Sequence, residues 1–228
     1  QQIGKTPIVV NDSRGFFTSR VFGTFVQEGL RMLAEGIHPA KIEMAALKAG
    51  MPVGPLAIQD EVSLTLSEHV AAETRKALQA EGKERPRSGA DEVIETMIHQ
   101  FDRKGKAAGA GFYDYPEGGK KSLWEGLSYW KKEQTVDEQE LIDRFLFVQS
   151  LDTLRCLEEG VLESVVDGNV GSIFGIGFAP WTGGALQFLN QYGLKDALNR
   201  AQALEQRYGE RFAPPQLLKD KVAQDEQI

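Results

Sequence analysis

The chain contains few of the residues that mark disulfide-stabilised, metal-binding and membrane-spanning proteins. A single cysteine, Cys156, excludes an internal disulfide framework and favours a reducing compartment. The three histidines, His38, His69 and His99, have no second His or Cys at ligand spacing, so no metal site is predicted. The longest strongly apolar stretch, residues 172–181, is about half as long as a bilayer requires, and we expect no membrane span.

Positive charge is also in short supply. The 26 lysines and arginines face 33 aspartates and glutamates, which leaves a formal net charge of −7. Nucleic-acid binding requires a clustered basic surface, so this class of function is excluded. An anionic ligand of any kind would need a local pocket. The apolar fraction of 41% and the charged fraction of 26% are ordinary for a folded globular protein and argue against disorder.

Apolar residues recur at helical spacing along almost the whole chain, and this pattern predicts an essentially all-α fold. Asp12 or Ser13 is expected to cap the first helix, and Gly36 is expected to end it in the left-handed conformation. A capping box is predicted at Thr135–Glu138, at the start of a later helix. The predicted helices cover residues 14–35, 39–49, 55–62, 64–81, 91–101, 135–160, 167–174, 183–192, 194–208 and 215–224.

Two short segments depart from this helical pattern. Residues 8–10 form a β-branched run without a partner strand, and we interpret them as the end of an element that has been cut away. Residues 112–115 could pair as a short strand inside a basic, glycine-rich segment, residues 102–121. We expect this segment to be a linker or a docking loop.

An internal repeat is the most specific signal in the sequence. Residues 20–37 read RVFGTFVQEGLRMLAEGI, and residues 144–161, at a constant offset of 124, read RFLFVQSLDTLRCLEEGV. The proline turn at residues 50–55 returns at residues 175–180 after a one-residue insertion. Two copies of one helical unit are therefore predicted. From the residues alone, such a unit is either a structural or dimerising module or one wall of a ligand site.

The residues themselves offer little chemistry. Ser19 and Asn11 lie around the start of the first helix, where free N–H groups favour an oxyanion or a carbonyl; the alternative for Ser19 is a solvated or back-bonding helix serine. Cys156 takes the place that Met32 has in the first copy, which indicates a buried core thiol. Residues 109–111 follow a basic loop and open no helix, so they are not a dinucleotide-binding turn. On these grounds alone the chain is not a complete enzyme.

Residues 5–20 resemble the junction in 3-hydroxyacyl-CoA dehydrogenases where the last Rossmann strand passes into the C-terminal helical domain. The resemblance continues through residues 51–55, MPVGP, and residues 109–115, GAGFYDY. The second copy, with residues 155–160 and 175–184, resembles the tail of the multifunctional α-subunits of fatty-acid β-oxidation. Essentially the whole chain is covered in order.

The resemblance implies a duplicated, all-α C-terminal domain of the 6-phosphogluconate/3-hydroxyacyl-CoA dehydrogenase type. Residues 1–12 would be the remnant of the last Rossmann strand, residues 13–122 the first helical repeat and residues 123–228 the second. The implied activity is NAD-dependent oxidation of an (S)-3-hydroxyacyl-CoA to the 3-ketoacyl-CoA, in a parent enzyme fused to an enoyl-CoA hydratase. The NAD fingerprint and the catalytic His–Glu pair lie in the missing Rossmann domain. We therefore expect no cofactor in this fragment and no activity from the isolated chain.

The resemblance also assigns candidate site residues. The family carries an Asn in the first helix of this domain, facing the reacting carbonyl, and Ser19 stands at the matching position. A serine hydroxyl can still donate a hydrogen bond, but it is shorter by one amide group. By motif position, Val53, Pro55 and Ile58 would line the acyl-chain side of the cleft; the alternative is ordinary turn and core packing. The basic loop at residues 103–121 either meets CoA phosphates or is solvated.

The implied partners are the 3-hydroxyacyl-CoA substrate, the Rossmann domain of the same parent chain, a thiolase subunit and a second copy in a homodimer. The implied location is the bacterial cytoplasm, and mitochondrial and peroxisomal locations stay open. The alternative function belongs to a different class, a non-catalytic helical dimerisation or scaffolding module. Serine in place of the family Asn favours that alternative.

Overall fold

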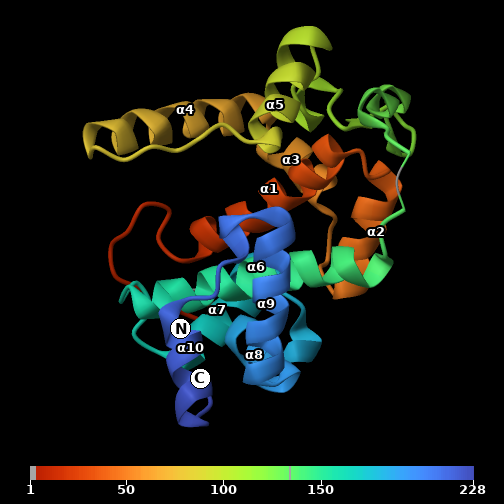
Figure 1. Cartoon of the computed structure of the whole chain (residues 1–228). Helices are drawn as coiled ribbons and strands as arrows, with labels where there is room; N and C mark the ends of the chain where they lie inside the picture. The colour runs from red at the N-terminus through yellow and green to blue at the C-terminus, as the bar shows by residue number, and fades with distance from the viewer. Residues whose placement is uncertain (1–3, 134) are drawn as a thin grey trace. The chain divides into compact units, whose positions relative to one another are not determined.

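The computed structural model describes residues 4–133 and 135–228, and the predicted all-α fold is confirmed (Figure 1). No helix in these two ranges is both long enough and apolar enough to cross a bilayer. The helices of the first half are α1 (Thr18–Glu35), α2 (Pro39–Ala49), α3 (Pro55–Val62), α4 (Leu64–Ala80) and α5 (Gly89–Glu95). Those of the second half are α6 (Glu138–Glu158), α7 (Val165–Ile176), α8 (Ala185–Tyr192), α9 (Leu194–Tyr208) and α10 (Gln216–Gln224).

Shorter elements connect these helices. A π-helical turn, Thr96–Gln100, continues α5, and a 3₁₀ turn, Glu125–Trp130, precedes α6. The strands β1 (Tyr113–Asp114) and β2 (Ser122–Leu123) pair antiparallel, with Tyr113 opposite Leu123. The short strand predicted at residues 112–115 is therefore confirmed.

The chain divides into two compact units. Unit 1 comprises the residues up to Phe25, Lys48–Pro52 and Ile142–Ile228, and unit 2 comprises Val26–Leu47 and Val53–Leu141. The division falls inside α1 and near the start of α6, so each unit is discontinuous in sequence. The predicted ranges divide the chain by sequence, into a strand remnant at residues 1–12 and two repeats at residues 13–122 and 123–228. They do not correspond to the two compact units, and the repeat boundaries stay a prediction.

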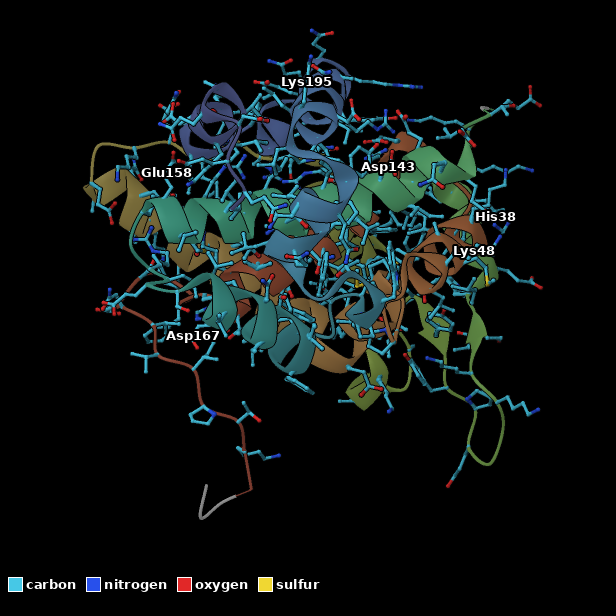
Figure 2. The ribbon with its side chains drawn as sticks, turned by 90° about the horizontal axis from the view of Figure 1, so that it is seen from below. His38, Lys48, Asp143, Glu158, Asp167 and Lys195 are labelled. Carbon is cyan, nitrogen blue, oxygen red and sulfur yellow. The ribbon has the colours of Figure 1, made fainter. Side chains whose placement is uncertain are left out.

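The core of unit 1 is built around α6. Phe147 and Leu151 of this helix are completely buried, and Phe147 meets Phe188 of α8 edge-to-face with ring centroids 5.4 Å apart. Asp143 on α6 (Figure 2) accepts a hydrogen bond from Arg200 Nε on α9 at 2.7 Å. Apolar contacts and this ion pair together fasten α8 and α9 to α6.

Unit 2 has a smaller core. Ile42 of α2, Leu56 of α3 and Val93 of α5 are completely buried. In contrast, α4 buries only its first residue, Leu64, and Val70 in its middle is 54% exposed. Because apolar burial stabilises packed helices, α4 contributes little to this core beyond its first turn.

The first helix begins four residues later than predicted. Phe16 N donates to Ser13 O at 2.8 Å in a tight turn, and Gly15 and Phe16 have φ of 79° and 49°. Left-handed residues cannot continue a right-handed helix, so the cap predicted at Asp12 or Ser13 is wrong. At the other end, Gly36 has a φ of 98°, which confirms its predicted role as the stop.

The long helix α6 also begins after its predicted start. Its first residue is Glu138, and Asp137 Oδ1 accepts a hydrogen bond from Gln139 N at 3.3 Å. The capping position therefore belongs to Asp137, and the capping box predicted at Thr135–Glu138 is wrong. The starts of α2, α3, α4 and α9 agree with the prediction.

Residues 8–10 have a partner that was not predicted. Val10 forms an isolated antiparallel bridge with Leu162, and Asn11 N donates to Val161 O at 2.9 Å. The segment is thus held to the turn that follows α6. The prediction that it lacks a partner within the chain is wrong.

Cys156 is a core thiol, as its place in the repeat predicted. It is completely buried in a cluster with Phe17, Val21, Val161 and Leu162. Burial raises the pKa of the Cys156 thiol to about 12. Because the thiolate is the reactive form, this residue is not a nucleophile at neutral pH.

Candidate functional site

Ser19, the candidate catalytic position, lies in the first turn of α1 with an exposed side chain. Its two sequence neighbours are both anchored within unit 1. Thr18 lies against α7, and Arg20 forms ion pairs with Asp152 of α6 and with Glu159, the residue after this helix. The Ser19 hydroxyl is therefore presented from a helix end that is fixed on two sides, and it is free to donate to an oxygen atom of a ligand.

Two glycines of α7 allow the start of α1 and the residues before it to approach closely. A Cβ on Gly171 would lie 2.6 Å from Ile8 Cδ1 and 2.9 Å from Phe17 Cε1. A Cβ on Gly175 would lie 2.9 Å from Thr18 Cγ2. Real side chains do not sit this close, so any larger residue would push the first turn of α1 away.

Arg20 fixes α1 from the other side. Its Nε and Nη2 donate to the two carboxylate oxygens of Asp152, both at 3.2 Å. Its Nη1 and Nη2 donate to Glu159 at 2.5 and 3.1 Å. The hydrogen bond from Arg20 lowers the pKa of Glu159, and the same bond raises the pKa of Arg20. A bidentate guanidinium defines the orientation of α1 against α6, and the sequence did not predict it.

The three residues predicted to line the acyl-chain side lie at the start of α3 in unit 2. Val53 is 38% exposed, Ile58 is half-buried and Pro55 is buried. A Cβ on Gly29 would collide with the Pro55 ring, so Pro55 packs directly on the backbone of α1. Pro55 and Ile58 lie on α3 and Val53 lies two residues before it, all in unit 2, whereas Ser19 belongs to unit 1.

A buried carboxylate in unit 2 was missed by sequence reasoning. Asp60 on α3 is 1% exposed and accepts hydrogen bonds from Phe112 N at 2.8 Å, Tyr113 N at 2.9 Å and Tyr115 Oη at 2.9 Å. Burial raises the pKa of Asp60 despite these donors, and burial beside Asp60 also raises the pKa of Tyr115. Asp60 therefore holds the segment around β1 to α3.

Glu43 on α2 forms a second buried link. Its Oε1 accepts a hydrogen bond from Leu56 N at 2.8 Å at the start of α3, and its Oε2 accepts from Tyr113 Oη at 2.6 Å. Burial raises the pKa of Glu43, and burial beside Glu43 raises the pKa of Tyr113. The free N–H groups of α3 are capped by this distant side chain, because Gly54 at the cap has none to offer.

The basic segment at residues 102–121 is anchored by an arginine. Arg103 is buried; its Nε donates to Gly111 O at 2.6 Å, and its Nη2 donates to Asp114 Oδ1 at 2.6 Å. Its guanidinium carbon lies 4.3 Å from the centroid of the Trp124 ring. The segment is therefore an integral part of unit 2, and the prediction of a linker is wrong.

The two buried carboxylates have a structural role. Their oxygens are occupied by backbone N–H and tyrosine donors of unit 2, which leaves them fixed acceptors rather than free acid–base groups. In the described residues, no group of three or more His, Cys, Asp or Glu side chains could hold a metal ion. Unlike these carboxylates, the exposed hydroxyl of Ser19 is unoccupied within the described residues, and it stands where the resemblance places an Asn that faces the reacting carbonyl.

Comparison with known proteins connects this architecture to a family. Residues 15–115 match the model for the 3-hydroxyacyl-CoA dehydrogenase C-terminal domain. The fatty acid oxidation complex subunit alpha of two Vibrio cholerae O1 strains is 34% identical over 214 residues, which cover 92% of this chain. The chain spans only 29% of the length of these relatives.

Two solved structures share the fold. A 3-hydroxybutyryl-CoA dehydrogenase from Escherichia coli superposes with a TM-score of 0.72 and 21% identity over 97% of this chain and 62% of that one. The dehydrogenase part of multifunctional enzyme 1 from C. elegans gives a TM-score of 0.63 and 21% identity, over 96% of this chain and 50% of that one. The predicted resemblance is confirmed, and residues 15–115 belong to the 3-hydroxyacyl-CoA dehydrogenase family as its C-terminal domain.

Proposed function

We propose that this chain is the C-terminal helical part of an NAD-dependent (S)-3-hydroxyacyl-CoA dehydrogenase of fatty-acid β-oxidation, carried in a longer polypeptide that also contains an enoyl-CoA hydratase. One observation carries the proposal. The similarity to fatty acid oxidation α-subunits extends over 92% of this chain but over only 29% of theirs. The catalytic His–Glu pair and the NAD site would then lie in the part of the polypeptide outside this chain.

The residues described here do not fit NAD. A dinucleotide site needs a strand, a glycine-rich turn and the start of a helix, whereas β1 and β2 are two residues long. In the glycine-rich loop, a Cβ at Gly111 would collide with Asp60 Oδ1, so a carboxylate occupies the space where a phosphate would have to approach. This chain would therefore form the substrate side of the cleft, and NAD would be held by residues outside it.

In this proposal Ser19 donates a hydrogen bond to the oxygen of the reacting carbon. Support comes from its family position, its exposure and the two anchors that fix the first turn of α1. Such a donor favours the charge that develops on oxygen in the transition state. Val53 and Ile58 would contact the acyl chain, while Pro55 sets the start of α3 through its contact with Gly29.

We further infer that the helices α1–α5 and α6–α10 are two copies of one unit, residues 13–122 and 123–228, preceded by a strand remnant at residues 1–12, of which residues 1–3 lie outside the described residues. The backbone supports this inference. Ser63, between α3 and α4, has φ 80° and ψ 130°, and Gly193, between α8 and α9, has φ 88° and ψ 116°. A positive φ is rare for serine, so its recurrence at the equivalent junction points to common descent.

The location, substrate and partners of the parent polypeptide follow from the same family. The parent polypeptide would act in the cytoplasm of a bacterium, take a 3-hydroxyacyl-CoA and pass the 3-ketoacyl product to a thiolase subunit. This chain would pack against its own Rossmann domain and could meet a second copy in a homodimer.

The test measures NADH formation from (S)-3-hydroxybutyryl-CoA by the 228-residue chain and by the longer polypeptide of the same gene. We expect no turnover by the chain alone and turnover by the longer polypeptide. In the longer polypeptide, Ser19→Ala should lower kcat by about 10²-fold, the usual cost of removing one such donor. Ser122→Ala, which removes an exposed hydroxyl on β2, is the matched control and should leave kcat unchanged.

The same experiment decides between the proposal and its alternative, a non-catalytic dimerisation or scaffolding module. Serine at the position of the family Asn favours the alternative. A longer polypeptide without dehydrogenase activity would support it. If the longer polypeptide is active and Ser19→Ala leaves its kcat unchanged, the dehydrogenase assignment is supported, but the proposed hydrogen bond from Ser19 to the reacting oxygen is contradicted.

A further inference from the structure

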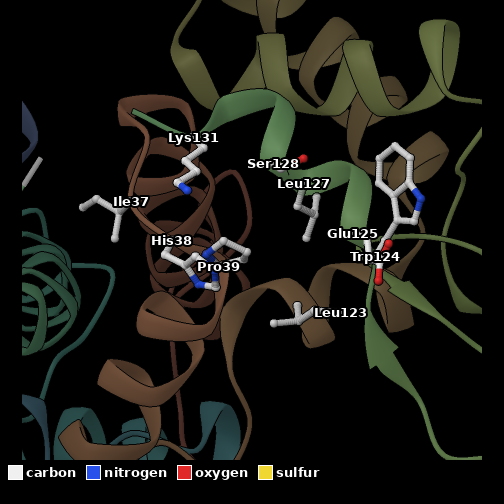
Figure 3. Close-up of a pocket in the computed structure, with 9 residues that line it drawn as sticks. All are labelled: Ile37, His38, Pro39, Leu123, Trp124, Glu125, Leu127, Ser128 and Lys131. Carbon is white, nitrogen blue, oxygen red and sulfur yellow. The ribbon is translucent and has the colours of Figure 1, made fainter. Parts of the chain in front are cut away.

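An apolar cavity of about 300 Å³ lies in unit 2 between the start of α2 and the 3₁₀ turn Glu125–Trp130 (Figure 3). Ile37, Pro39 and Leu127 form much of its apolar lining. Its volume is at the lower end of the range for small-molecule sites. None of the residues proposed for the dehydrogenase cleft lines it.

A second cavity, of about 280 Å³, adjoins the first and has a basic lining. The two cavities share Ile37, His38 and Lys131, and the second adds Lys41 and Lys132. In Figure 3 the Lys131 amine points toward His38. Each cavity is also lined by one glutamate, so cations outnumber carboxylates only in the second.

The lysines differ in what already engages them. Lys132 Nζ donates to Ala34 O at 3.0 Å and is committed to the end of α1. Within the described residues, Lys41 and Lys131 form no ion pair, and both are exposed. Their charges are available to a ligand, in a chain whose formal net charge is −7. Because the net charge of the chain repels anions, any attraction for an anion must come from these nearby lysines.

His38 adds a directed hydrogen-bond donor between the two cavities. Ala40 N donates to His38 Nδ1 at 3.2 Å, so a ring proton is assigned to Nε2. An Nε2–H group can donate to a carboxylate or phosphate oxygen. The apolar wall and the basic wall thus meet at a residue with a directed hydrogen-bond donor.

We propose that the two adjoining cavities form a binding site for a small amphiphilic organic anion. Its apolar body lies against Ile37, Pro39 and Leu127, and its carboxylate or phosphate lies by Lys131 and Lys41. Burial of the body and charge-assisted hydrogen bonds to the head contribute together. A ligand with only one of these features binds more weakly.

The experiment titrates octanoate into the 228-residue chain, with calorimetry for affinity and backbone amide shifts for location. We expect saturable one-to-one binding with shifts centred on Leu127 and Lys131. Lys131→Gln removes one charged donor from an exposed position and should weaken binding by about tenfold. Lys195→Gln, at an exposed lysine of α9 (Figure 2), is the matched control and should leave the affinity unchanged.

Two further probes separate the parts of the proposal. Octan-1-ol has the apolar body without the charge, and inorganic phosphate has the charge without the body; each should bind at least about tenfold more weakly than octanoate. Ser128→Trp, at an exposed residue of the first cavity, should fill it and abolish binding. Circular dichroism checks that each variant is folded. Unsaturable binding, octanol or phosphate binding as tightly as octanoate, or Lys131→Gln with unchanged affinity would overturn the proposal.

Discussion

The carboxylate of Asp60 accepts hydrogen bonds from donors that lie 52, 53 and 55 residues later in the chain. This one side chain holds the irregular segment around β1 against α3. The pairing of β1 with β2, two residues each, could not do so alone. Buried polar groups are costly when they lose a partner, so the contribution of Asp60 depends on all three donors remaining paired.

Asp60→Asn should lower the free energy of unfolding by about 2–3 kcal/mol, because the amide keeps one acceptor oxygen and turns a donor toward other donors. Urea unfolding of the 228-residue chain measures the change. Asp102→Asn is the matched control; Asp102 is 84% exposed and pairs with Lys104, so its substitution should leave the free energy of unfolding almost unchanged. Equal effects of the two substitutions would contradict the structural role of Asp60.

At the scale of elements, the contact between α7 and the segment that leads into α1 depends on the absence of side chains on α7. Gly171 lies mid-helix, where glycine is normally unfavourable, but a Cβ there would meet Ile8 and the buried ring of Phe17. Gly23, inside α1, would place its Cβ more than 4 Å from any neighbour. Replacement of these two glycines by alanine should therefore change the stability of the chain in opposite directions.

Gly171→Ala should destabilise the chain by about 1–3 kcal/mol through overpacking, despite the gain in helix propensity. Gly23→Ala, the matched control, should stabilise it by about 0.5–1 kcal/mol because only propensity changes. Urea unfolding of both variants gives the two values. Stabilisation by both substitutions would mean that α1 and α7 adjust easily and that the first turn of α1 is not fixed by this contact.

Helix starts were predictable where a residue type determines them. Pro39 and Pro55 occupy first helical positions, where a missing N–H has no cost, and Gly193 precedes α9. The start of α1 was not predictable, because the left-handed conformation of Phe16 is unusual for a residue with a side chain. Residues 8–10 were misjudged because their partner lies after α6, about 150 residues away.

The residues of the candidate site were likewise predictable only in part. The family motif located Ser19, Val53, Pro55 and Ile58, but periodicity could not identify the residues that position them. Glu43 and Tyr113 are 70 residues apart in sequence. Spacing patterns report neighbours within one helix or strand, so pairings of this kind become visible only in the folded chain.

At the scale of the whole molecule, acidic residues outnumber basic ones, and their response to pH is not uniform. Burial raises the pKa of Glu43 and Asp60, so the folded state binds their protons more readily than the unfolded state, and their contribution falls as pH rises through the raised pKa. The hydrogen bond from Arg20 lowers the pKa of Glu159, which reverses the sign. The stabilisation from Glu159 is present above its ordinary pKa and is lost as pH falls.

Glu159→Gln isolates the second kind of carboxylate. At pH 7 the variant should be less stable than the wild type by under about 1 kcal/mol, because the Glu159 side chain is 49% exposed and its ion pair with Arg20 is screened by solvent. The difference should shrink as pH falls below about 4.3, the ordinary pKa of a glutamate, since the wild type then loses the charge that the variant never had. Urea unfolding at a series of pH values measures it, with Glu117→Gln, an exposed glutamate in the loop between β1 and β2, as the matched control. A difference that stays constant between neutral and acidic pH would mean that the ionised form of Glu159 does not hold α1 to α6.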